Sequence, residues 1–251
     1  MTFNGADVLI APNQYLSGPC ISFEQSGVRH LLRNEEEGNR LKILVWKQSP
    51  TVHLYTFKYM LGDPATTNES VLFFVDLFTF RQPYFIAFLT LRNTTPEPLL
   101  DLYLEFLLDF NVGGIEHYDE NSGEYHPDDH VVTQTAPGFP MIGFGSPAHP
   151  SHWQVSAARK LHPTEGRRHL NNQMSYGPGD CALGLEWDIP RIEAGQDGFT
   201  PVIVAGGPDY YDFLINYRAG VERTKRITHR VFYSIHHPSR FTPQKTADGR
   251  Q

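Results

Sequence analysis

One segment, residues 100–110, restricts the possible folds of this chain more than any other. Its even positions are all apolar: Leu100, Leu102, Leu104, Phe106, Leu108 and Phe110. The odd positions include Asp101, Glu105 and Asp109. A period of two is typical of a β-strand with one face in the core. On a helix the six apolar residues would spread around the whole circumference and demand complete burial, so we predict a strand.

The neighbouring segments extend this prediction to an all-β fold. Residues 84–92 are rich in Phe and Ile, and the link at 93–98 holds two prolines, which cannot continue a ladder. We therefore expect an antiparallel hairpin with residues 100–110. Other short β-branched or aromatic runs lie at 41–46, 52–59, 71–79, 131–133, 141–144, 153–155, 182–189 and 199–205. Without helices between them, these runs favour antiparallel sheets packed face to face.

A single helix is expected near residues 209–227, on the outside of the sheets. Asp209 can cap its start, and Phe213, Leu214, Tyr217 and Val221 follow at helical spacing. We expect residues 1–235 to form one domain and 236–251 a flexible tail. Basic residues concentrate in 218–251. They fit a solvated helix end followed by a loose tail, or contact with an acidic patch of this chain or of a second copy, so a homo-oligomer stays possible.

Charge and composition exclude several classes of partner. The formal net charge of −7 argues against nucleic acid as a ligand. The most apolar stretch, 71–91, is interrupted by Asp76, Arg81 and Pro83, which argues against a membrane span. The first residues do not resemble a secretory signal, so we expect a cytoplasmic protein whose Cys20 and Cys181 are free thiols. No nucleotide, phosphate or metalloprotease motif is present, and we expect no cofactor.

The densest polar segment is 116–130, where three histidines and six carboxylates fall within fifteen residues. It fits a sugar-binding or catalytic loop, a cation site with oxygen and imidazole ligands, or an ordinary solvated loop. The spacing does not match a calcium loop of the EF-hand type, and we assign no metal. For a sugar site the candidates are His117, Asp119, Glu124 and His126. We expect the segment to be ordered at the rim of the sheets, because it follows a strand end rich in glycine.

A second candidate group is His152 with Trp153. Carbohydrate sites place flat aromatic rings against the apolar face of a sugar, while imidazoles and carboxylates bind its hydroxyl groups. The alternative is that Trp153 belongs to the core and the neighbouring histidines lie on a loop.

A family resemblance appears in four segments. Residues 89–104, 109–114, 179–190 and 199–207, followed by the helix from Asp209, resemble the sandwich domain that precedes the helical catalytic barrel of prokaryotic glucoamylases. That domain shares the super-sandwich fold of galactose mutarotase and polysaccharide lyases. The resemblance implies an all-β, two-sheet antiparallel super-sandwich with one C-terminal helix, and a link to carbohydrate.

The resemblance implies a carbohydrate-binding or carbohydrate-processing accessory protein with a saccharide as its partner. It carries no catalytic residues over, because the glucoamylase carboxylates belong to the helical barrel, which has no counterpart in these 251 residues. Mutarotases use a His and a Glu, but no particular pair in this sequence matches their motifs. Two alternatives stay open: a small mutarotase-like or lyase-like enzyme, and an assembly protein without a small ligand.

Overall fold

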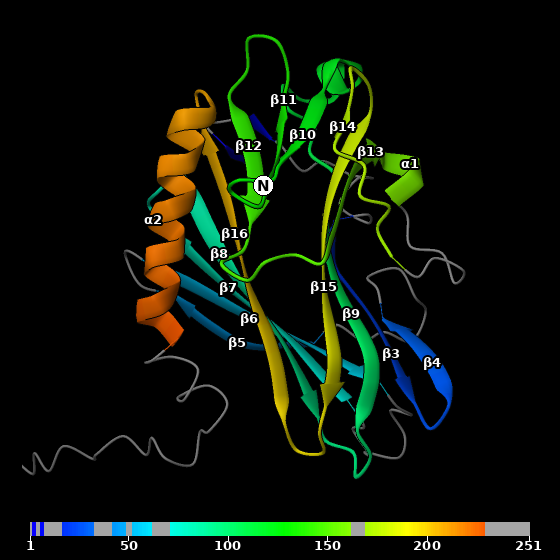
Figure 1. Cartoon of the computed structure of the whole chain (residues 1–251). Helices are drawn as coiled ribbons and strands as arrows, with labels where there is room; N and C mark the ends of the chain where they lie inside the picture. Colours follow the sequence, from blue (N-terminus) through cyan, green and yellow to red (C-terminus); the bar gives the residue numbers. More distant parts are fainter. Residues whose placement is uncertain are drawn as a thin grey trace, which may run out of the picture.

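Two antiparallel sheets packed face to face, with one long helix on the outside, form most of the described part of the protein (Figure 1). The computed structural model describes residues 2–3, 6–7, 17–32, 42–48, 52–61, 71–161 and 169–228. The predicted fold class, a two-sheet antiparallel super-sandwich with one C-terminal helix, is confirmed. Residues 236–251 lie outside the described part, and the domain boundary at 235 stays a prediction.

In the described part of the chain, the larger sheet has nine strands and the smaller has five. In spatial order the larger contains β14 (Ser175–Tyr176), β10 (Ser122–His126), β11 (Val131–Thr135), β12 (Met141–Gly145), β16 (Asp197–Gly207), β8 (Tyr84–Asn93), β7 (Val71–Phe80), β6 (Val52–Leu61) and β5 (Lys42–Gln48). The smaller contains β13 (His152–Ala157), β15 (Cys181–Ile192), β9 (Leu99–Leu108), β3 (Gly18–Gln25) and β4 (Val28–Leu32). A separate short pair joins β1 (Thr2–Phe3) to β2 (Ala6–Asp7).

The strand predicted from the alternation at 100–110 is β9, and its even residues from Leu102 to Leu108 face the core between the sheets. The prediction of one polar face is wrong, because most of the other face is buried too. On that face Leu107 packs with α1 (Ala158–Leu161) and with Leu170. Leu100 is 37% exposed, since a bulge at Asp101, whose φ is 47°, shifts the end of the strand.

The predicted hairpin between residues 84–92 and 100–110 is wrong. Strand β8 pairs with β7 and β16 in the larger sheet, whereas β9 pairs with β15 and β3 in the smaller one. The link at 93–98 therefore crosses from one sheet to the other. The Asn93 side chain holds this crossing, donating to Glu97 O at 2.7 Å and Ile192 O at 3.2 Å and accepting from Thr95 N at 3.0 Å.

The predicted C-terminal helix is α2 (Tyr210–Thr228). Asp209 caps it as expected, because its Oδ1 accepts a hydrogen bond from Asp212 N at 3.0 Å. Phe213 and Tyr217 pack against the outer face of the larger sheet, where Ile203 lies. Among the described residues no helix has the length and apolarity to cross a membrane. Cys20 and Cys181 are both buried, and neither forms a disulfide among the described residues.

A matched pair of leucines on β9 tests which residues of this strand face the core. Leu104→Ala removes a side chain that is 4% exposed and should reduce the free energy of unfolding by about 2–5 kcal/mol. Leu100→Ala, beyond the bulge, should cost less than about 1 kcal/mol. Urea unfolding measures both values. Equal losses at the two positions would contradict the register.

Candidate functional site

The structure disperses the residues predicted from the polar segment 116–130. The segment is ordered, but much of it is regular structure: residues Ile115–Glu120 form a 3₁₀ helix, η2, and residues Ser122–His126 form β10. His117 lies in η2, where its Nδ1 is 3.2 Å from Glu120 Oε2 and its ring packs on Phe139. Asp119 is exposed in the same turn of helix.

Glu124 and His126 lie on the outer face of the larger sheet, and His126 Nε2 is 2.8 Å from Thr133 Oγ1. Trp153 points to the space between the sheets and stacks on Tyr125, with ring centroids 4.2 Å apart. Its ring therefore packs with the core. His152, the next residue, points to the opposite face of the smaller sheet. The six predicted residues thus do not converge on one place.

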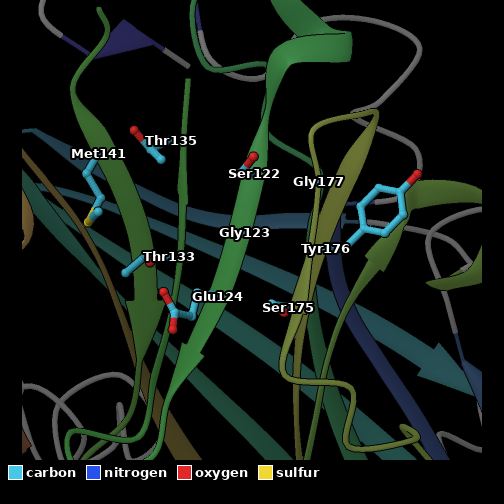
Figure 2. A pocket seen from close by; sticks show the side chains of 9 residues that line it. All are labelled: Ser122, Gly123, Glu124, Thr133, Thr135, Met141, Ser175, Tyr176 and Gly177. Carbon is cyan, nitrogen blue, oxygen red and sulfur yellow. The ribbon is translucent and has the colours of Figure 1, made fainter. Parts of the chain in front are cut away.

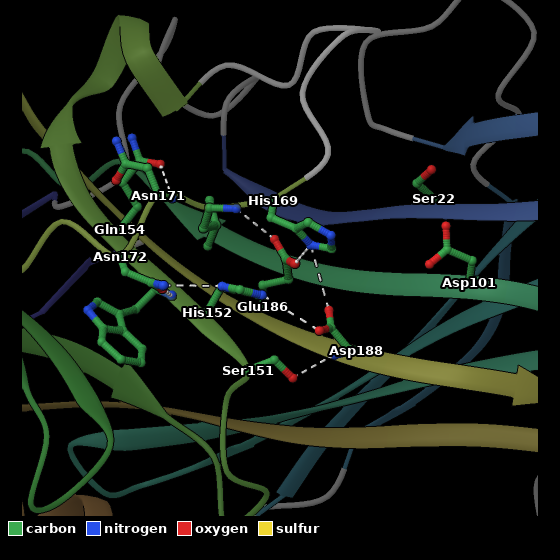
Figure 3. A network of polar contacts seen from close by, with 12 residues as sticks. Ser22, Asp101, Ser151, His152, Gln154, His169, Asn171, Asn172, Glu186 and Asp188 are labelled. Carbon is green, nitrogen blue, oxygen red and sulfur yellow. Dashed lines mark hydrogen bonds and ion pairs between the residues drawn. The ribbon is translucent and has the colours of Figure 1, made fainter.

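One compact polar cluster does form on the outer face of the smaller sheet (Figure 3). It contains His152, His169, Glu186 and Asp188, whose nearest ligand-type atoms all lie within 4.8 Å of one another. The register places His152 of β13 opposite Glu186 of β15, and Asp188 follows two residues later on the same face. Of these four, only His152 was selected from the sequence. The two carboxylates at alternate positions of an apolar strand were the available signal.

Glu186 is the buried member of the cluster, with no exposed surface. Its carboxyl group accepts a hydrogen bond from Leu170 N at 2.9 Å and lies 2.5 Å from His169 Nδ1. Glu105 of β9, equally buried, pairs with it across the strands and is hydrogen-bonded to it. Burial, reinforced by the negative charge of Asp188, raises the pKa of Glu186 to about 7.

The hydrogen bonds place the two imidazoles in opposite tautomers. When Glu186 is ionised, His169 donates from Nδ1, so its Nε2 is free to accept a proton. In His152 the donor and acceptor roles of the two ring nitrogens are reversed. Asn172 Oδ1 accepts from Trp153 N at 3.2 Å, which turns the Asn172 amide nitrogen toward His152 Nδ1 at 3.3 Å. His152 Nδ1 accepts this bond, so its proton resides on Nε2, 3.6 Å from Asp188 Oδ2.

This arrangement favours proton exchange over metal binding. Two imidazoles and two carboxylates are a donor set that can hold a divalent ion. A metal ligand must offer a lone pair, however, and Asn172 holds the His152 proton on the Nε2 atom that faces the cluster. The rings of His152 and His169 lie 4.8 Å apart, so an acceptor and a donor stand side by side at the surface.

The comparisons with known proteins identify a fold but no family. No family model matches the chain, and no curated protein matches it. Among solved structures, a bacterial glucoamylase complexed with acarbose matches with a TM-score of 0.58 at 9% identity, over 84% of this chain and 30% of that chain. The sandwich thus resembles a glucoamylase domain, as the sequence resemblance implied, and the chain spans under a third of that enzyme.

Two further structures match more distantly. A homologue of GalM/aldose epimerase from C. elegans has a TM-score of 0.45 at 7% identity, over 74% of this chain and 78% of that chain. A heparan sulfate lyase from Pedobacter heparinus has a TM-score of 0.42 at 9% identity, over 68% and 22% of the respective chains.

The raised pKa of Glu186 makes stability depend on pH. The folded state binds this proton more tightly than the unfolded state does, where the pKa is near 4.5. The associated stability is therefore complete below about pH 4.5 and is lost as pH rises through 7, by roughly 3 kcal/mol for a shift of this size. Glu186→Gln, which cannot ionise, should remove this loss. Urea unfolding from pH 5 to pH 8 measures it, with the exposed Glu116→Gln as control, and parallel curves for all three proteins would contradict the expectation.

Proposed function

We propose that this chain processes a carbohydrate by acid–base proton transfer at the cluster of His152, His169, Glu186 and Asp188. His169 acts as the base through Nε2, and the neutral His152 stabilises the departing oxygen by donating a hydrogen bond from Nε2–H. The observation that carries this proposal is the different partner at each Nδ1: the Glu186 carboxyl at His169 and the Asn172 amide nitrogen at His152, in two imidazoles whose ring centroids are 4.8 Å apart. We infer the opposite tautomers from these partners. The glucoamylase match supports a carbohydrate as the ligand at the level of the fold.

The other members of the cluster position these two groups. Glu186 is buried and stabilises the imidazolium that forms when His169 accepts a proton. Asn172 holds the His152 tautomer. His169 is 41% exposed and His152 27% exposed, so a ligand at the surface can reach both rings, whereas Glu186 acts only through His169.

Anomeric interconversion of an aldose is the reaction that best fits such a pair. His169 Nε2 takes the proton of the anomeric hydroxyl as its oxygen forms the carbonyl and the bond from C1 to the ring oxygen breaks. His152 stays neutral and donates a hydrogen bond from Nε2–H to the ring oxygen, which then takes the proton that His169 holds. The reverse steps close the ring on the other face of the carbonyl, so no external reactant is needed. The carboxylates of Glu186 and Asp188 disfavour a uronate beside them and favour a neutral sugar.

Removal of either imidazole should abolish most of the activity. His169→Asn and His152→Asn should each lower kcat by at least about 100-fold, the size typical of general acid–base catalysis. His149→Asn changes an exposed histidine outside the cluster and should keep the wild-type rate. Polarimetry of freshly dissolved glucose and galactose measures the rates. Full activity in the His169 variant would overturn the assignment.

The tautomer of His152 can be tested through Asn172. In Asn172→Asp a carboxylate oxygen would face His152 Nδ1 and draw the proton to that nitrogen, which leaves Nε2 as an acceptor. We expect kcat to fall almost as far as in His152→Asn, with little change in KM. Nitrogen-15 chemical shifts of the His152 ring report the tautomer directly. An unchanged tautomer together with reduced activity would assign Asn172 a different role.

A second candidate function is saccharide binding without turnover. The glucoamylase match supports a carbohydrate ligand at the level of the fold and carries no catalytic residue to this chain. Tryptophan fluorescence, measured beside the rate of anomeric interconversion, distinguishes the two functions. Trp153 is a suitable probe because its backbone N–H bonds to the Asn172 side chain that contacts His152. A saturable change with glucose, maltose or galactose, without anomeric interconversion, would favour binding. Absorbance of an unsaturated product from uronic-acid oligomers would instead indicate lyase chemistry.

A further inference from the structure

The larger sheet has a hollow of about 610 Å³ on its outer face, across four of its strands (Figure 2). It lies on the opposite sheet from the His–carboxylate cluster. Most of the residues around it are small or polar, among them Ser122, Glu124, Thr133, Thr135 and Ser175, and Met141 is apolar. Its volume is within the range of small-molecule sites in proteins.

The strand register explains why these side chains share one face. Ser175 of β14 pairs with Glu124 of β10, which in turn pairs with Thr133 of β11. Ser122 pairs with Thr135 in the same way, two residues along. Residues paired directly across strands point to the same side of a sheet. The hydroxyl groups and the carboxylate therefore form two adjacent rows.

Among the described residues, the hollow lies where most side chains of the sheet are small and where α2 does not cover the sheet. Helix α2 packs over β16 and β8 through Phe213 and Tyr217. On β12, Gly143 continues the row of Thr133, and a Cβ atom there would lie 2.2 Å from Val132 O. The position thus has no room for a side chain, so no side chain protrudes from the sheet beside Thr133 on β12.

The lining groups are available to a ligand. Among the described residues, the hydroxyl groups of Ser122, Thr135 and Ser175 and the carboxylate of Glu124 have no hydrogen-bond or ion-pair partner. Hydroxyl groups donate and accept, and a carboxylate accepts from two neighbouring hydroxyls of a sugar. Met141 adds an apolar contact, and none of the lining residues is basic, so the hollow does not suit an anion.

We infer that this hollow is a second saccharide site, selective for a neutral oligosaccharide, with Glu124 as its central hydrogen-bond acceptor. The site is separate from the acid–base cluster, and its occupancy does not require turnover there. The segment 169–177 runs between the two places, held by bonds from Val155 N to Gln173 O at 3.0 Å and from Tyr125 N to Met174 O at 2.7 Å. His169 begins this segment at the cluster, and Ser175 lies near its end at the hollow.

The test is a titration of nitrogen-15-labelled protein with maltotriose, cellotriose and galactobiose, followed by amide chemical shifts. A neutral sugar should shift the amides of Gly123, Thr133 and Ser175. Glu124→Gln should weaken its binding at least about tenfold, because a charged acceptor is replaced by a neutral one. Glu116→Gln, at an exposed carboxylate outside the hollow, is the matched control and should keep the wild-type Kd.

A steric variant tests the location independently. Ser175→Trp fills the hollow from its exposed edge strand and should abolish the amide shifts, whereas Ser175→Ala should retain them. His169→Asn should bind as the wild type does, which separates this site from the proposed catalytic one. A parallel titration with spermidine, a polycation, tests whether the hollow binds cations instead of sugars. Three results would overturn the inference: no amide shift with any of the three sugars, an unchanged Kd in Glu124→Gln, or shifts of these amides with spermidine and not with the sugars.

Discussion

The alternation of side chains along each strand is the constraint on which the rest of this structure depends. Because neighbouring residues point to opposite faces, burying the apolar residues of β9, β15 and β16 between the sheets commits the intervening residues to the outer faces. Glu186, Asp188 and His152 reach one outer face in this way, and Ser122, Glu124 and Thr133 reach the other. Both candidate sites are thus consequences of how the core is packed.

The two outer faces are built differently. The smaller sheet is buried on both sides along much of β9 and β15, since α1 and Leu170 cover its outer face beside the cluster. Glu105 and Glu186 are therefore both buried away from water, where two ionised carboxylates are poorly solvated. For this reason the pKa of Glu186 rises. The outer face of the larger sheet beside α2 carries the residues Ser122, Thr135 and Ser175, which are partly or fully exposed, so that their hydroxyl groups cost little there. The first environment favours proton chemistry, and the second favours reversible binding.

Several features could be predicted from the residues. The period of two at 100–110 identified a strand, and Asp209 with the apolar spacing behind it identified the capped helix α2. The resemblance of the strand and turn pattern to a glucoamylase sandwich domain pointed to the fold. The pairing of strands was less predictable: residues 84–92 and 100–110 lie next to each other in sequence but belong to different sheets. Asn93 holds that crossing through contacts as distant as Ile192 O, which local sequence does not reveal.

The amino-acid sequence by itself determined the all-β class and the helix, because period and capping are local properties. The tertiary structure alone decided which polar residues meet. His169 joins His152 and Glu186 through a segment whose backbone bonds to β13, and Trp153 turns toward Tyr125 in the core while its neighbour His152 faces outward. Such meetings depend on register and on contacts between distant strands, where a shift of one residue would exchange the two faces.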